Sequence, residues 1–199
     1  NRQLNLTIAI AFIDRYVNDE ASYFKRKDEV KQEVLDFVHA NRHLDSVDVS
    51  INTADLPGRG LPGLYLTVLG TSADGADSGQ VGRGNRVNGI IPLNRPTCSE
   101  AAAGKNPASH VGKIYNLLTY QIANRIQRET SGVREVYVWL LSQIGQPINE
   151  PKIASVQLIL KPGTSMKEIS SHVEDLVSAE LLNIDKFSEE LAHGRIPVC

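Results

Sequence analysis

Residues 70–116 read GTSADGADSGQVGRGNRVNGIIPLNRPTCSEAAAGKNPASHVGKIYN, and we expect the rest of the chain to fold around this segment. It contains eight of the fifteen glycines and separates two groups of apolar runs. A connection this long without a pattern of its own is uncommon in a compact domain and is usually either functional or disordered. Composition alone allows disorder. Apolar side chains of the buried type favour a functional segment: Val81, Val87, Ile90, Ile91 and Leu93.

The composition is that of an ordinary soluble globular protein, with 41% hydrophobic and 22% charged residues. The 199 residues suffice for one large domain or two small ones. A net charge of -2 gives no global field that would recruit nucleic acid or an anionic membrane, so we expect neither partner. Cys98 and Cys199 form neither a disulfide framework nor a zinc site. No signal peptide and no run of about 18 apolar residues is present, which favours a cytoplasmic protein.

Upstream of the segment, the sequence predicts two strands around a helix, and then a third strand. Residues 4–13 alternate apolar with small or polar side chains, as a half-buried strand does. Residues 20–40 have apolar side chains near helical spacing and a charged opposite face, which predicts an amphipathic helix. Strands are predicted at 47–51 and 64–68, and the Gly, Pro and Asp of residues 52–63 predict a turn between them.

Downstream, the dipeptide Asn106-Pro107 predicts the start of a helix, because Asn can cap free amides and Pro is tolerated in the first turn. Gly132 is predicted to close that helix. Residues 136–144 are apolar on both faces, which predicts a central strand with Tyr137 and Trp139 in the core.

The remaining elements are a strand and a helix. Residues 153–160 are predicted to form the strand, and Ser165 with Glu168 forms the sequence pattern of a capping box that opens the helix. The last dozen residues are predicted to form a short helix or a tail.

This order of elements predicts an α+β fold in which helices pack on one face of a sheet. We expect residues 1–70 with 135–160 to form a sheet-and-helix region and residues 71–134 to form a binding loop with its following helix. Residues 161–199 would then form a C-terminal helix and tail.

Common nucleotide motifs do not match the glycine-rich segment. Residues 82–87 lack the third glycine of a dinucleotide fingerprint, and residues 104–106 have neither the Ser/Thr nor the upstream glycine of a Walker A loop. No nucleophile elbow, zinc signature or metal-spaced His cluster occurs either.

The types of residue in the segment nevertheless favour a polyphosphate or nucleotide site. Glycines let successive backbone amides approach phosphate oxygens. Arg83 and Arg86 carry planar guanidinium groups suited to bidentate phosphate contact. Lys105 precedes a predicted helix N-terminus, where free amides already favour an anion. Asp77, among glycines, could hold an amine or a hydroxyl.

Each candidate also has an interpretation without a ligand. The arginines could be solvated surface groups, and the lysines could be ordinary exposed lysines. The aspartates are common turn residues. His110, in the first turn of the predicted helix, could simply cap it. The other candidates with such alternatives are Asp74, Asp77, Arg83, Arg86, Lys105 and Lys113.

Beyond these general arguments, long runs of the chain resemble the archaeal-type S-adenosylmethionine synthetases, or methionine adenosyltransferases. The matching runs span nearly the whole chain. They are INTAD at 51–55, YLTVLGTSADGADSGQVGRGNRVNG at 65–89, EAAAGKNPASHVGKIYN at 100–116, EVYVWLLSQIGQPINEP at 135–151 and ASVQLI at 154–159. The chain resembles roughly the C-terminal half of such an enzyme, since the family's upstream GHPD and GQGS-type segments are absent. The start without Met also suggests a fragment, which we expect to be inactive alone.

The resemblance implies a fold of repeated sheet-plus-helices units of β-α-β-β type about a pseudo-threefold axis. It implies an enzyme that joins ATP and L-methionine into S-adenosylmethionine and hydrolyses the released tripolyphosphate to phosphate and diphosphate. Mg²⁺ is required in this family, and K⁺ is commonly used. The active sites lie between the two subunits of a homodimer.

The resemblance also implies roles for particular residues. The run ADSGQVGR is similar to GDCGLTGR of the bacterial branch, which gives Asp77 a contact with methionine and nucleotide and gives Arg83 a contact with phosphate. AAGKNP is similar to FSGKDP, which assigns Lys105 to the phosphates. The bacterial TKVDR aligns poorly with ASHVGK, so His110 and Lys113 are the nearest candidates for its lysine, and its metal-binding aspartate has no counterpart.

Catalysis in such an enzyme needs no general base, because the methionine sulfur is already a good nucleophile. The barrier lies in charge that builds on the departing triphosphate, which fixed cations and Mg²⁺ stabilise. Arg83, Arg86 and Lys105 are the predicted catalytic residues, and Lys113 is a further candidate. Two alternatives stay open: a non-catalytic module that binds nucleotide or polyphosphate, and a dimerisation domain with a flexible glycine-rich loop.

Overall fold

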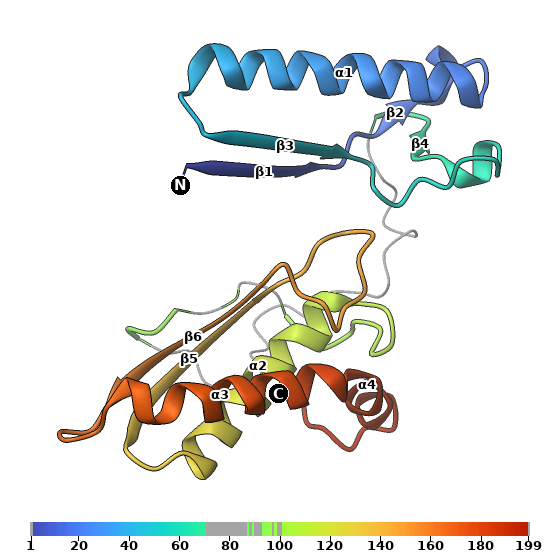
Figure 1. Cartoon of the computed structure of the whole chain (residues 1–199). Helices are drawn as coiled ribbons and strands as arrows, with labels where there is room; N and C mark the ends of the chain where they lie inside the picture. The colour runs from blue at the N-terminus through green and yellow to red at the C-terminus, as the bar shows by residue number, and fades with distance from the viewer. Residues whose placement is uncertain are drawn as a thin grey trace. The chain divides into compact units, whose positions relative to one another are not determined.

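The computed structural model describes residues 2–70, 87, 89, 93–96, 98 and 101–198. It shows a mixed α+β chain that divides by its contacts into two compact units, Asn1–Ala76 and Asp77–Cys199 (Figure 1). The α+β class is therefore confirmed. The grouping of residues 1–70 with 135–160 stays a prediction.

The first unit is built on a parallel pair of strands that one long helix connects. β1 (Gln3–Ile8) pairs in parallel with β3 (Ser46–Ile51), and α1 (Glu20–Asn41) lies along them in Figure 1. The apolar face of both strands is the more buried one, as the alternation predicts. Asp19 and Ser22 form a reciprocal capping box at the start of α1, which fixes the helix start near the predicted residue.

A second, shorter parallel pair lies in the same unit. β2 (Phe12–Ile13) pairs with β4 (Leu66–Thr67), and a 3-10 turn at Leu61–Gly63 precedes β4. The prediction of one continuous strand over 4–13 is wrong. The side-chain amide of Asn52 accepts from the Ile10 N–H at 2.7 Å and donates to the Ile10 carbonyl at 2.9 Å, which ends β1 before β2 begins.

The second unit packs helices on one face of an antiparallel hairpin. β5 (Val133–Leu141) pairs with β6 (Ile153–Leu160), and α2 (Val111–Glu129), α3 (Met166–Leu182) and α4 (Ile184–Ala192) complete the unit. Helix residues at the predicted inward positions are buried, and alternate strand residues pack against them. The helix residues include Ile114, Leu118, Ile122, Ile126, Val173, Leu176 and Val177; the strand residues are Val136, Val138, Leu140, Val156 and Leu158.

Three sequence predictions for this unit are wrong. Within the described residues β5 pairs only with β6. Its outer face is partly exposed, with Trp139 39% exposed, and Arg95 lies on it against Glu135 and Tyr137, so β5 is neither a central strand nor fully core. α2 begins at Val111 rather than at Asn106-Pro107. At α3 the side chain of Ser165 makes no capping hydrogen bond, and only its carbonyl accepts, from the Glu168 N–H at 3.1 Å.

α2 ends at Glu129 with Thr130 as its C-cap, so Gly132 lies two residues beyond the cap and directly before β5. Gly132 has a φ of 80°, which glycine adopts without strain, and a Cβ there would collide with the Thr164 side chain. Among the described residues, no helix is both long and apolar enough to span a bilayer.

Candidate functional site

Two of the predicted site residues are buried lysines that lie together at the start of α2. Lys105 is 3% exposed and Lys113 is 8% exposed, and the Lys113 ammonium donates to the Lys105 carbonyl at 3.0 Å. Loss of hydration lowers the pKa of Lys113, and the neighbouring charge of Lys105 lowers it further. The alternative interpretation of both as ordinary exposed lysines is therefore wrong.

The turn before α2 is held by two side-chain caps. The Asn106 side-chain oxygen accepts from the backbone N–H of Ala108 at 2.8 Å and of Ser109 at 3.2 Å. His110 is the N-cap of α2, and its Nδ1 accepts from the Gly112 N–H at 3.1 Å. Asn106 thus caps a separate turn, and the cap of the helix is His110, as one interpretation of the sequence suggested.

This cap determines which ring nitrogen of His110 carries a proton. A nitrogen that accepts from a backbone N–H must be unprotonated, so Nδ1 is bare and the proton of the neutral ring is on Nε2. His110 therefore presents one N–H donor at the start of the helix that carries Lys113, while its own ring and carbonyl accept from the amides of Gly112, Lys113 and Ile114. The His110 N–H and the two lysines are groups of the kind that bind an anion.

Two described residues inside the glycine-rich segment contribute to the core of the second unit. Val87 is 7% exposed and Ala102 is fully buried, and both belong to the cluster that contains Ile114 and Tyr115. Leu93, by contrast, is fully exposed, so its assignment to the buried class is wrong. The other residues used for that argument lie outside the described residues: Val81, Ile90 and Ile91.

A comparison with known protein families identifies the family of this chain. A family model described as S-adenosylmethionine synthetase (AdoMet synthetase) matches residues 1–195. The chain belongs to this family. The S-adenosylmethionine synthase of Methanothermobacter thermautotrophicus is 45% identical over 197 residues, which are 98% of this chain and 49% of that protein.

Other S-adenosylmethionine synthases give the same result. The protein of Archaeoglobus fulgidus is 47% identical over 98% of this chain and 48% of its own length. The protein of Pyrococcus horikoshii is 47% identical, again over 98% of this chain and 48% of its own length. The chain therefore spans about half the length of the curated relatives it matches.

Three of the predicted site residues lie in the described part of the chain near the start of α2. Lys113 contacts Lys105, and His110 is the N-cap of the helix. The predicted Asp77, Arg83 and Arg86 lie outside the described residues, as does Asp74. Among the described residues, no group of three or more His, Cys, Asp or Glu side chains could hold a metal ion, so no described residue is assigned to Mg²⁺.

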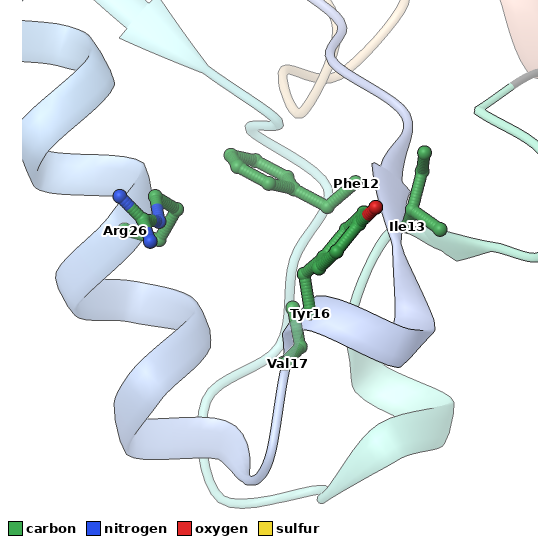
Figure 2. Close-up of a pocket in the computed structure, with 5 residues that line it drawn as sticks. All are labelled: Phe12, Ile13, Tyr16, Val17 and Arg26. Atoms are coloured by element: carbon green, nitrogen blue, oxygen red, sulfur yellow. The ribbon is translucent and has the colours of Figure 1, made fainter.

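A pocket in the first unit was not predicted from the sequence. It has a volume of about 280 Å³ and is lined by Phe12, Ile13, Tyr16, Val17 and Arg26 (Figure 2). Its one charged side chain, Arg26, is paired with Glu29 on the exposed side of α1 at 3.0 Å. The lining is therefore mostly apolar, and none of the predicted site residues contributes to it.

A buried polar network around Asp55 in the first unit was also not predicted from the sequence. Its members Tyr23 and Lys27 come from α1, and Asn52 and Asp55 follow β3. The available signal was the run INTAD at 51–55, which the resemblance singled out without a role for its polar residues.

Proposed function

We propose that the intact protein is a methionine adenosyltransferase that forms S-adenosylmethionine, phosphate and diphosphate from ATP, L-methionine and water. The observation that carries the proposal is the buried pair of Lys105 and Lys113 at the start of α2, in a chain that belongs to this family. The charges of two neighbouring lysines favour a polyanion, and a triphosphate is one.

In the proposed reaction, the methionine sulfur attacks C5′ of the ribose. A new S–C5′ bond forms, the C5′–O bond breaks, and its electron pair leaves with the tripolyphosphate. Lys105 and Lys113 stabilise the charge that builds on the leaving group, together with Arg83 and Arg86. Asp77 holds methionine and nucleotide in line for attack. Mg²⁺, when bound, neutralises part of the polyphosphate charge, and K⁺ is a further expected ion.

The proposal also covers which part of the enzyme this chain forms and how the subunits assemble. This chain corresponds to the C-terminal half of the enzyme, and its α+β units are members of a set of repeated sheet-plus-helices units. The active sites are shared between the two subunits of a cytoplasmic homodimer. The coverage of about half of each relative supports the view that a second half of the protein completes the site.

The direct test is turnover by the intact protein. With ATP, L-methionine, Mg²⁺ and K⁺, we expect S-adenosylmethionine, phosphate and diphosphate in equal amounts, measured by chromatography and by phosphate assay. Protein that is folded but forms no S-adenosylmethionine would contradict the proposal. Binding of inorganic tripolyphosphate without turnover would instead identify a non-catalytic polyphosphate-binding module.

His110 offers a separate prediction, because its two ring nitrogens have different roles. In His110→Asn the side-chain oxygen can still cap α2, whereas the Nε2–H donor is lost. We expect an unchanged melting temperature and an affinity for tripolyphosphate about tenfold lower, as for one lost hydrogen bond to a charged group. Calorimetric titration measures the affinity.

The control for His110 is His110→Gln, which keeps an N–H donor at the distance of Nε2 and loses the cap. It should lower the melting temperature more than His110→Asn does and retain more affinity. If both variants bind tripolyphosphate as the unsubstituted protein does, His110 is a helix cap only.

A further inference from the structure

Asp55 is a buried carboxylate that joins three parts of the first unit. Its side chain is 4% exposed, and its Oδ2 accepts from the Tyr23 hydroxyl and from the Lys27 ammonium, each at 2.8 Å. Its Oδ1 accepts from the backbone N–H of Tyr65 at 3.1 Å. Burial raises the pKa of Tyr23 to about 12, so its hydroxyl keeps its proton and remains a donor to Asp55.

Asn52 extends this network to the end of β1. It has a φ of 44°, in the left-handed region that asparagine tolerates better than most residues. Its amide nitrogen donates to the Tyr23 hydroxyl at 2.8 Å and to the Ile10 carbonyl at 2.9 Å. Its amide oxygen accepts from the Ile10 N–H at 2.7 Å. The position at which the chain turns from β1 into β2 is therefore set by the network.

The network thus places both strands of the β2–β4 pair. These strands have two residues each, too few to hold their register through their own ladder. Beyond Tyr65, the Thr67 hydroxyl donates to the Phe12 carbonyl at 3.1 Å and accepts from the Gly70 N–H at 3.0 Å. Hydrogen bonds therefore hold this segment at Tyr65, Thr67 and Gly70, directly before the segment that contains Asp77 and Arg83.

We propose that Asp55 is a positioning residue of the synthetase reaction, which fixes the path of residues 64–70 from which the chain continues to Asp77 and Arg83. This inference rests on the proposed function. A buried ion pair is a poor stabiliser, because the cost of removing both charges from water offsets their attraction. A fully satisfied buried network does, however, select one backbone arrangement. The network around Asp55 is suited to fixing geometry, and misplacement of a site by about 1 Å can cost on the order of 100-fold in rate.

The test compares Asp55→Asn with a matched variant in the second unit, both made in the intact protein. Glu180 is a similarly buried carboxylate, 9% exposed in its side chain, that accepts from Arg125 at 2.8 Å and from Gln121 at 2.6 Å. Asp55→Asn and Glu180→Gln each neutralise one buried carboxylate that has a cationic partner. Both should lower the melting temperature. Only Asp55→Asn should lower kcat/KM for ATP, on the order of 100-fold, and speed amide exchange in peptides covering residues 64–70.

Tyr23→Phe is the milder second variant, because it removes the hydroxyl and keeps the buried ring. It should change the same two quantities in the same direction and by less. Equal kinetic losses in Asp55→Asn and Glu180→Gln, or unchanged exchange of residues 64–70 in Asp55→Asn and Tyr23→Phe, would overturn the inference. Failure of the unsubstituted protein to form S-adenosylmethionine would overturn the proposed function instead, and the exchange rates would still show whether Asp55 fixes this segment.

Discussion

Lys105→Met in the intact protein should lower the turnover of ATP and methionine by about 100- to 1,000-fold, which corresponds to about 3–4 kcal/mol of lost transition-state stabilisation. The replacement has a similar length and stays apolar in a site where the lysine is only 3% exposed. Folding should therefore be little affected, while the leaving triphosphate loses one fixed cation. Steady-state kinetics measures the loss, and a thermal melt of the same preparation measures stability.

The control for Lys105 is an exposed lysine of the same unit. Lys167 lies on the surface of α3, and Lys167→Met should leave both turnover and melting temperature nearly unchanged. Arg83→Ala is expected to resemble Lys105→Met, since both residues are assigned to the triphosphate. A loss of stability as large as the loss of turnover in Lys105→Met would indicate that the buried ammonium has a structural role.

The elements that periodicity defines were predictable from the sequence. The apolar faces of α2 and α3 are buried at the expected spacing, and α1 extends over almost the predicted residues. These elements follow from local patterns, since residues three and four apart share one face of a helix. The position of Lys105 beside Lys113 follows from the same local geometry, because the turn between them spans only a few residues.

Interactions between distant residues account for most of the errors. No local pattern predicts that Asn52 takes the hydrogen bonds of Ile10, 42 residues away, and so divides the predicted first strand. The buried pair of Lys27 and Asp55 is separated by 28 residues and was likewise missed. Caps failed for another reason: the Asn106 side chain caps a separate turn, and the Ser165 side chain makes no capping hydrogen bond although both residues match capping patterns. Periodicity alone also could not show that one face of β5 is partly exposed, with Trp139 at 39%.

Lys113→Met should weaken the binding of inorganic tripolyphosphate by about tenfold or more, as expected for the loss of a charge-assisted contact. It should also change how stability depends on pH. Burial and the charge of Lys105 lower the pKa of Lys113 in the folded chain from its ordinary value of 10.5. Between the lowered value and 10.5, the unfolded chain binds this proton and the folded chain does not, so the stability of the unsubstituted protein rises with pH in that window.

The variant lacks this titration, so its stability relative to the unsubstituted protein should be greatest at neutral pH, where the buried charge is fully present. The difference should shrink as pH rises toward 10.5, and chemical denaturation at several pH values measures it. Bound tripolyphosphate should raise the pKa of Lys113 again, because its negative charge favours the protonated lysine. Binding should therefore take up a proton at alkaline pH. A stability difference independent of pH, together with unchanged tripolyphosphate affinity, would show that Lys113 serves only to hold the Lys105 carbonyl at the start of α2.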